Sequence, residues 1–377
     1  KMDIVLAAPT GRAAKRMTEA TGYEAKTIHR LLEVSGGIED GDSSHFEKNE
    51  DNPIEADAVI LDEMSMVDIH LMYSLLKAIV PGTRLILVGD SSQLPSVGPG
   101  NVLKDIIDSK AFSVVRLSKI YRQAESSHIV LNAHKINAGE LITLDNKNKD
   151  FFFFEKKDVR SVMGALVYLV KTRLPEYIGA SPFEIQVLTP MRKGELGVEH
   201  LNEVLQYYLN PASESKKEKE GRTGVFREGD KVMQVKNNYK LEWKITNAKG
   251  FSIEEGLGVF NGDMGIIKQI NTYSERITVV FDENREAEYP FSSLDELELA
   301  YAITIHKSQG SEYPAVVLPL LSGPPILCNR NLLYTAITRA QKCVAIAGRQ
   351  SMVEQMIHNE TEQKRYSGLN DCLKEGL

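Results

Sequence analysis

The first third of the chain alternates short apolar runs with amphipathic stretches. Runs without polar residues are typical of parallel strands that helices cover on both faces. Apolar residues at helical spacing lie between these runs, so the pattern predicts β-α-β units around a parallel sheet. The expected strands are residues 3–8, 58–61, 84–88 and 114–117, and the expected helices are 12–19 and 67–80.

A second α/β pattern begins after Asp150 with a run of four phenylalanines at 151–154. Between 224 and 289 the apolar runs become short, and Gly, Asn and Asp separate them, which is typical of antiparallel strands. We therefore expect a second lobe with a small β-barrel inserted into it. The lobe is expected to contain strands 184–188, 315–318 and 343–347 with helices 159–172 and 330–339, and the barrel strands 231–235, 265–270, 277–281 and 287–289.

Two polar segments interrupt these patterns. Residues 36–53 are rich in Gly, Asp, Ser and Asn, which fits either a hairpin projecting from the first lobe or a disordered insertion. Residues 213–222 are rich in Ser, Lys and Glu and are expected to form a mobile, solvated loop.

The composition is that of a globular protein with several domains. At 377 residues the chain exceeds the size at which single hydrophobic cores stop growing. Hydrophobic residues make up 42% and charged residues 26%, and no apolar run reaches the roughly 18 residues that a membrane span needs. The amino terminus lacks the layout of a secretion signal, so we expect a cytoplasmic protein.

Charge and cysteine content narrow the function little. The net charge of −7 argues only mildly against nucleic-acid binding, because that affinity depends on local clusters of Lys and Arg. The three cysteines, Cys328, Cys343 and Cys372, lie far apart and form no C-x-x-C pair, so we assign them no chemistry.

Two adjacent carboxylates follow the apolar strand expected at 58–61. Ligands bind at the carboxyl ends of parallel strands. There Asp62 can hold Mg²⁺ through water, while Glu63 can orient and deprotonate an attacking water, as in a Walker B site. The alternative is a strand that ends in surface acids, and these residues alone leave both interpretations open.

The strand expected at 84–88 is also followed by a carboxylate, Asp90. Gln93 lies on the next loop, and its amide offers a donor and an acceptor together, so it could bond both an attacking water and a γ-phosphate oxygen. The alternative is an ordinary turn rich in Gly and Pro. Two such strands in one lobe favour a catalytic site.

Together with other segments, these residues resemble the motifs of RecD-like superfamily 1 DNA helicases, the family of exodeoxyribonuclease V alpha subunits. The match covers nearly the whole chain, and the order of the motifs is more specific than any one of them. Motifs II and III are matched by DEMS at 62–65 and GDSSQLPSVGPG at 89–100. Motif Ia is matched by APTGRAA at 8–14, and the segment that follows it by TIHRLL at 27–32. Motifs IV, V and VI are matched by YRQ at 121–123, TIHKSQGSE at 304–312 and LYTAITRA at 333–340.

The resemblance implies roles in ATP hydrolysis. It assigns Arg122 and Arg339 to neutralising the charge that develops on the γ-phosphate, although an arginine on a helix is more often solvated or paired. It implies that Asp90, Gly310 and Glu312 bind nucleotide, with Glu312 accepting a hydrogen bond from the ribose. The implied cofactors are ATP and Mg²⁺.

The resemblance also implies a path for DNA. Motif Ia residues Pro9, Thr10, Gly11 and Arg12 lie where a strand passes into a helix, so backbone N–H groups there can bind a phosphate. The further residues for which DNA contact is implied are His29, Thr304, His306 and Lys307; for the threonine and the histidines the alternatives are helix capping and a satisfied core histidine. Trp243, among lysines, fits either base stacking or packing within a loop.

No P-loop, G-x-x-x-x-G-K-[ST], occurs in the sequence. In the family this loop lies just upstream of the strand that begins at Lys1, so we expect the chain alone to bind ATP weakly and to be inactive. The intact protein is expected to translocate 5′ to 3′ on single-stranded DNA and to unwind duplex DNA, with other repair or nuclease subunits as candidate partners. The alternatives are a non-catalytic nucleic-acid-binding remnant and an RNA helicase of the same superfamily.

The fold class implied is α/β, with two RecA-like P-loop NTPase lobes containing parallel sheets and an SH3-like β-barrel inserted in the second. The expected domains are 1–140 (first lobe, with a pin-like hairpin at 36–56), 151–223 and 297–350 (second lobe), 224–296 (barrel) and 351–377 (C-terminal tail).

Overall fold

The structure is a computed structural model in which the chain divides into two compact units, each described by itself. The first unit contains residues 1–120 and 362–377, and the second contains 121–361. The helix at 128–137 therefore belongs to the second unit, and the end of the chain belongs to the first. The residues that the structure describes are 2–33, 46–117, 127–222, 224–247, 251–361, 365 and 367–376.

The first unit is built on a parallel sheet of order β2-β1-β3-β4. Three of its strands lie where the apolar runs predicted them. Residues 114–117 form no strand, and Val115 is 88% exposed. The strand predicted at 114–117 was therefore wrong. An apolar run becomes a strand only where its backbone hydrogen-bonds to a neighbouring strand, and no described strand pairs with these residues. The strands are β1 (Ile4–Ala8), β2 (Ala25–Thr27), β3 (Ala58–Leu61) and β4 (Arg84–Leu87).

The helices of the first unit begin at polar capping residues. The side chains of Thr10, Thr27 and Asp68 each accept a hydrogen bond from a backbone N–H in the first turn of the helix that follows. Apolar side chains of α3 and α4 then pack on β3 in one core. The helices are α1 (Gly11–Thr21), α2 (Ile28–Leu31), η1 (Met64–Met66), α3 (Ile69–Ala78), α4 (Val102–Ser109) and α11 (Leu369–Glu375).

The second unit contains a parallel sheet of order β16-β6-β17-β18-β5. Its central strands are buried on both faces, as near-continuous apolar runs predict. The strands are β5 (Phe151–Glu155), β6 (Ile185–Thr189), β16 (Ala302–Thr304), β17 (Tyr313–Leu320) and β18 (Ala340–Gly348). The helices are α5 (His128–Asn137), α6 (Val159–Tyr168), η2 (Leu169–Arg173), α7 (Leu174–Ile178), η3 (Pro182–Glu184), α8 (Val198–Leu209), η6 (His306–Ser308), α9 (Arg330–Ile337) and α10 (Gln350–His358). The α/β fold class with parallel sheets is confirmed.

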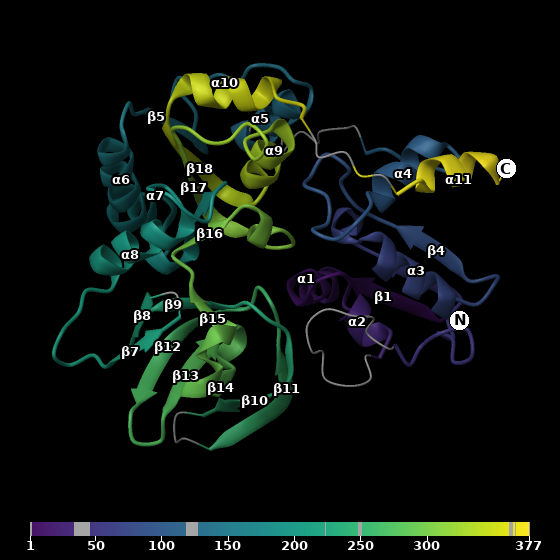
Figure 1. The fold of residues 1–377 in the computed structure, drawn as a ribbon, viewed down its shortest axis with the longest axis horizontal. Helices are drawn as coiled ribbons and strands as arrows, with labels where there is room; N and C mark the ends of the chain where they lie inside the picture. Colours follow the sequence, from purple (N-terminus) through teal and green to yellow (C-terminus); the bar gives the residue numbers. More distant parts are fainter. Residues whose placement is uncertain are drawn as a thin grey trace. The chain divides into compact units, whose positions relative to one another are not determined.

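The inserted β-rich part of the second unit is an antiparallel sheet of order β11-β10-β14-β13-β12-β9-β15, drawn in green in Figure 1. Its four predicted strands are present, and β10 and β11 form a long hairpin that was not predicted. The segment expected to be a mobile loop at 213–222 contains a strand, β7, that pairs with β8. The strands are β7 (Glu218–Gly221), β8 (Gly224–Arg227), β9 (Lys231–Gln234), β10 (Asn238–Thr246), β11 (Ser252–Val259), β12 (Met264–Asn271), β13 (Arg276–Phe281), β14 (Glu286–Pro290) and β15 (Leu297–Leu299), with short helices η4 (Asp282–Asn284) and η5 (Phe291–Glu296).

A buried carboxylate joins the inserted sheet to the lobe. Asp230, immediately before β9, accepts hydrogen bonds from Gln206 on α8 (2.6 Å), from Asn210 just after α8 (2.7 Å) and from the Tyr301 hydroxyl (2.8 Å). Burial raises the pKa of Asp230, while these donors act to lower it. All three partners donate, so the site is shaped for a carboxylate rather than an amide.

Candidate nucleotide and nucleic-acid sites

The carboxylates predicted to act in hydrolysis lie directly after β3. The Oδ1 atom of Asp62 accepts a hydrogen bond from the backbone N–H of Glu63 (2.8 Å). Glu63 has a φ of 54°, in the left-handed region that a residue with a side chain rarely adopts. Strained backbone of this kind persists only where surrounding structure holds it, and it clusters at functional sites.

The turn after β3 is held against the end of β4. The N–H of Met64 donates to the carbonyl of Val88 (3.0 Å), so the two strand ends are joined just beyond their ladder. A β-carbon on Gly89 would lie 2.9 Å from the nitrogen of Met64. Position 89 therefore requires glycine, because a side chain there would collide with the backbone of the turn after β3.

Asp90 and Gln93 form one hydrogen-bonded unit. The Gln93 side-chain amide donates to Oδ2 of Asp90 (3.3 Å), and Oδ1 of Asp90 accepts from the N–H of Ser92 (2.9 Å). The Gln93 N–H also donates to the Asp90 carbonyl (3.2 Å). Asp90 thus orients the Gln93 amide, a link that neither residue revealed in the sequence.

The donor set fits a magnesium ion that is bound mainly by phosphates and water. Among the described residues, Oδ2 of Asp62 has no hydrogen-bond partner, so this oxygen is available to a cation or its water. The described ranges contain no group of three or more acidic, His or Cys residues that could hold a metal. Mg²⁺ does not need such a group, since it is commonly held by one or two carboxylates plus substrate phosphates.

The predicted motif Ia residues lie at the amino end of α1. The Thr10 hydroxyl accepts a hydrogen bond from the N–H of Ala13 (3.2 Å), so it caps the helix. Gly11 is the first helical residue, Pro9 and Arg12 flank this turn, and no acidic side chain lies in the first turn of α1. The positive end of the helix dipole is therefore not neutralised locally, which suits an anion.

His29 lies on α2 and is half-buried. Burial lowers its pKa, and the charge of Asp68 only partly opposes this. The ring lies 6.0 Å, centroid to centroid, from the ring of Phe46. Burial thus favours the uncharged imidazole, which can offer a hydrogen bond or a stacking contact.

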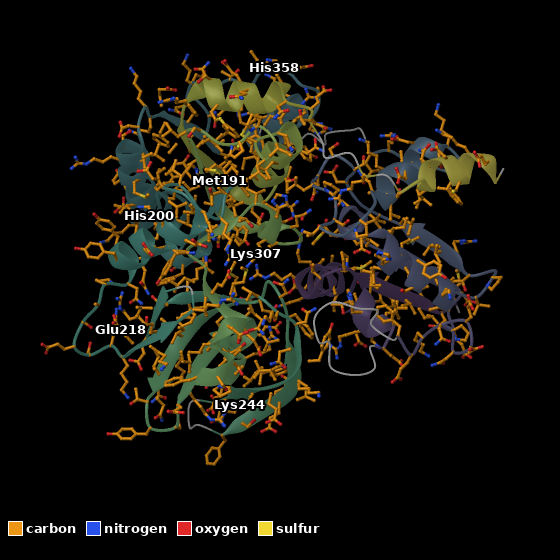
Figure 2. The ribbon with its side chains drawn as sticks, in the orientation of Figure 1. Met191, His200, Glu218, Lys244, Lys307 and His358 are labelled. Atoms are coloured by element: carbon orange, nitrogen blue, oxygen red, sulfur yellow. The ribbon has the colours of Figure 1, made fainter. Side chains whose placement is uncertain are left out.

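In the second unit, a shared carboxylate organises two cations at the carboxyl edge of the parallel sheet. The ammonium group of Lys307, labelled in Figure 2, lies 3.0 Å from Glu298, and Arg192 donates to the other oxygen of Glu298 at 2.6 Å. Burial acts to raise the pKa of Glu298, but Arg192 and Lys307 together lower it. Arg192 was not predicted from the sequence. Its position just after the strand that ends at Thr189 could have identified it as a candidate.

The neighbouring motif V residues lie on adjacent strand ends. Thr304 pairs in register with Thr189, and its hydroxyl accepts a hydrogen bond from the N–H of Lys307 (3.3 Å). His306 and Lys307 form the following short helix η6 and are half-buried. The structure thus brings Thr304, His306, Lys307 and Arg192 to one edge of the sheet.

Arg339 lies beside the other predicted nucleotide-binding residues of this unit. It is 3% exposed, and its guanidinium donates to the Ser311 carbonyl and to the Thr338 hydroxyl, both at 3.4 Å. Gly310 has a left-handed φ of 72°, which turns the chain into Ser311 and Glu312. Glu312 accepts a hydrogen bond from Gln341 (3.2 Å). Arg122 lies outside the described residues.

Models of three known protein families match the chain in succession. A model described as an AAA domain matches residues 1–99. The ATP-dependent RecD-like DNA helicase SH3 domain matches residues 201–281, which cover most of the inserted antiparallel sheet. A UvrD-like helicase C-terminal domain matches residues 299–347, the part of the second lobe that follows the insertion.

Two curated proteins extend this likeness over most of the chain. The ATP-dependent RecD2 DNA helicase of Deinococcus radiodurans is 36% identical over 347 residues, which are 92% of this chain and 43% of that protein. The RecBCD enzyme subunit RecD of Mycolicibacterium smegmatis is 30% identical over 98% of this chain and 66% of that protein. The chain therefore spans less than two thirds of either relative.

Solved structures show the same fold at lower identity. A Pif1 helicase from Bacteroides in complex with ADP-AlF3 and single-stranded DNA superposes with a TM-score of 0.51 at 20% identity, over 94% of this chain and 84% of that one. Two coordinating Pif1 helicases at forked duplex DNA give a TM-score of 0.53, also at 20% identity, over 94% of this chain and 83% of that one. Within the described ranges, no helix has the length and apolar character needed to cross a membrane.

Proposed function

Because this chain belongs to the RecD-like helicases, we propose that it supplies the motor of an ATP-dependent DNA helicase. The motor would couple ATP hydrolysis to 5′ to 3′ movement along single-stranded DNA and to duplex unwinding in DNA repair or recombination. The observation that carries the proposal is the pair of neighbouring parallel strands, β3 and β4, followed by Asp62-Glu63 and by the hydrogen-bonded pair Asp90 and Gln93.

Hydrolysis needs an oriented water and compensation of phosphate charge. In this proposal Glu63 accepts the proton of the attacking water, and Gln93, oriented by Asp90, holds that water in line. Asp62 would hold Mg²⁺ through water, and the bound ion would neutralise charge on the phosphates. Arg339 would supply a guanidinium from the second lobe, with Gly310 and Glu312 beside the nucleotide.

The DNA path would use groups that bind phosphate without reading sequence. The first-unit contribution is the amino end of α1, with Pro9, Thr10, Gly11 and Arg12, and His29 on the neighbouring helix. The second-unit contribution is the edge that carries Thr304, His306 and Lys307. Both sets of groups are backbone amides, hydroxyls and cations, which position a strand without specifying its bases.

Domain boundaries follow the same proposal. The first RecA-like lobe would comprise 1–120 and 362–377, and residues 224–296 would form the SH3-like barrel within a second lobe of 121–361. The boundary predicted at 140 and the tail predicted at 351–377 are moved accordingly, because α5 and α10 belong to the second unit. Residues 36–45 of the pin-like hairpin predicted at 36–56 lie outside the described residues. The RecBCD name of one relative motivates a search for partner subunits. Co-purification of the natural protein with a nuclease subunit would support that part.

Strand separation by the full-length natural protein tests the proposal. We expect ATP-dependent unwinding of a DNA duplex with a 5′ single-stranded tail, little unwinding with a 3′ tail, and none by Glu63→Gln. Preference for an RNA duplex would make the protein an RNA helicase, and ATP-independent binding without unwinding would make it a nucleic-acid-binding remnant. Either result would overturn the proposal.

Nucleotide affinity tests the expectation for the 377-residue chain alone. No P-loop motif occurs within its sequence, and the phosphates would lack the backbone cradle and lysine that such a loop supplies. We expect ATP binding too weak to detect at micromolar concentrations by calorimetry. A dissociation constant in the low micromolar range would contradict this expectation.

A further inference from the structure

The end of the chain returns to the first unit and packs on α4. Helix α11 lies against α4, and the partly buried side chain of Leu369 packs against the hydrophobic core of that unit. The Ser367 hydroxyl donates to Asp105 (2.8 Å), and the Asn370 amide donates to the Asp105 carbonyl (3.2 Å). Residues 367–370 are therefore anchored to α4 independently of what precedes them.

Just before this anchor, Arg365 binds the loop that follows β4. One guanidinium nitrogen of Arg365 donates to the carbonyl of Gly98, to the carbonyl of Gly100 (2.9 Å) and to the hydroxyl of Ser96 (3.3 Å). The Ser96 hydroxyl itself donates to the Gly98 carbonyl (3.2 Å). A loop without regular structure must find partners for its carbonyls, and Arg365 supplies a charged donor, which makes stronger hydrogen bonds than a neutral one.

The loop leaves little room to shift under this clamp. A β-carbon on Gly98 would lie 2.8 Å from the β-carbon of Asp68, and one on Gly100 would lie 3.2 Å from the β-carbon of Ile69. The Pro99 carbonyl also accepts the N–H of Ile69, at the start of α3 (3.0 Å). The loop is therefore packed between the amino end of α3 and the C-terminal segment.

The clamped loop is continuous with Gln93. Leu94 and Ser96 are 5% and 4% exposed, so alternate side chains between Gln93 and the clamp are buried, whereas Val97 is 87% exposed. At the other end, Asp90 holds Gln93 by its backbone and its side chain. The position of Gln93 thus depends on two fixed points, Asp90 before it and the carbonyls of Gly98 and Gly100 after it.

We propose that Arg365 is a positioning residue for ATP hydrolysis, which holds the loop 94–100 so that Gln93 is presented to the attacking water. The inference rests on the proposed function for the role of Gln93. It assigns a task to the C-terminal segment of the first unit, which holds the loop that carries Gln93. Arg365 acts through Gln93 and touches no reacting atom.

Hydrogen exchange of the 377-residue chain tests the clamp without any activity. In Arg365→Ala we expect faster exchange of the backbone amides at 92–101, with exchange in β1 and β3 unchanged. Arg365→Lys keeps the charge but loses the planar fork, so an intermediate rate is expected. Unchanged exchange at 92–101 in Arg365→Ala would overturn the positioning role, whatever the helicase does.

Steady-state ATPase of the full-length protein with single-stranded DNA tests the consequence. We expect Arg365→Ala to lower kcat by about tenfold to a hundredfold, the cost of a small misplacement at a catalytic centre, with KM for ATP little changed. Ser367→Ala is the matched control: it removes a bond of the anchor to Asp105 but leaves the clamp, so its kcat should stay near that of the unaltered protein.

The outcomes distinguish a specific role of Arg365 from general packing of the C-terminal segment, and they distinguish failure of this proposal from failure of the proposed function. Equal losses of kcat in Arg365→Ala and Ser367→Ala would overturn the proposal in favour of simple docking of the segment. A rise in KM without a fall in kcat would also overturn it. If Gln93→Ala retained full kcat, the proposed role of Gln93 would fail, while the exchange result would still decide whether Arg365 holds the loop.

Discussion

The parallel sheets of the two units carry opposite chemistry at their carboxyl ends. In the first unit, β3 and β4 are followed by Asp62, Glu63 and Asp90, which accept hydrogen bonds and repel anions. In the second, β6 and β16 are followed by Arg192 and Lys307, which share the carboxylate of Glu298. We propose from this difference that the first edge binds water and a cation, and that the second binds anions that displace Glu298.

The two sheets also differ in burial. Strand β6 is buried at every position, whereas β4 is an edge strand on which Ile86 is 39% exposed. Strand β6 pairs with a strand on each side, so it is the more rigid support for a binding site. In the first unit the strained turn at Glu63 instead depends on local bonds, those to Val88 and within the loop after β4.

The largest change in activity that would test this comparison of the two units is expected from substitution of Arg339. Arg339→Gln should lower kcat for ATP hydrolysis by about a thousandfold, since an arginine that neutralises the transferring phosphoryl group contributes about that much. Single-stranded DNA affinity should change little. ATPase and DNA-binding measurements on the full-length protein check both.

Arg349→Gln is the matched control for Arg339, because among the described residues the Arg349 guanidinium donates to one surface acceptor, the Lys157 carbonyl (2.7 Å). A melting temperature for each variant separates loss of catalysis from loss of the fold around the buried Arg339. Equal kcat values in the two variants would show that Arg339 takes no part in hydrolysis.

A smaller effect, on stability, is expected at Asp230. Asp230→Asn would turn an N–H toward groups that already donate, so the free energy of unfolding should fall by about 2 kcal/mol. Urea denaturation followed by tryptophan fluorescence measures the change, because Trp243 lies in the inserted sheet. Wild-type stability of the variant would mean that this carboxylate does not join the sheet to the lobe.

The smallest effect is expected at Lys307. Lys307→Gln should weaken binding to single-stranded DNA severalfold and reduce the slope of log affinity against log salt by about 0.7, the value for one phosphate contact. Glu298→Gln should strengthen binding, because it frees both cations from their carboxylate. Titrations of this chain at several salt concentrations would reveal opposite shifts for the two variants. Shifts in the same direction would show that the cluster is purely structural.

Strands that form apolar runs could be predicted from the sequence, even the half-exposed β4, whereas strands without such a run could not. The strands that precede Asp62 and Asp90 are apolar runs, and a motif marks each of them. Strand β11 is mostly exposed and carries acidic residues, so it has no apolar run from which a strand could be predicted. Trp243 on β10 packs against Gly256 on β11 and lies near Arg285, which precedes β14. These partners are distant in the sequence, so no local pattern predicts the contacts.

The candidate sites were predictable only where the side chains themselves carry the chemistry. The acids, Gln93 and Arg339 were assigned from spacing and motif order, and their roles stay predictions. Arg192 and Arg365 were not predicted as functional residues, because their partners lie far away in the sequence. Arg192 bonds Glu298, and Arg365 bonds the backbone carbonyls of residues 98 and 100. Backbone acceptors leave no trace in residue identity.

DNA-stimulated ATP hydrolysis by full-length Glu63→Gln, beside Glu55→Gln, tests the central claim most directly. Glu55 precedes the same strand at its amino end and is exposed, so it matches the substitution but not the site. We predict that Glu63→Gln lowers kcat by about a thousandfold, the range for loss of a general base, and that Glu55→Gln retains full activity. Retained turnover in Glu63→Gln would contradict the assignment of the carboxylate turn after β3 as the hydrolytic site.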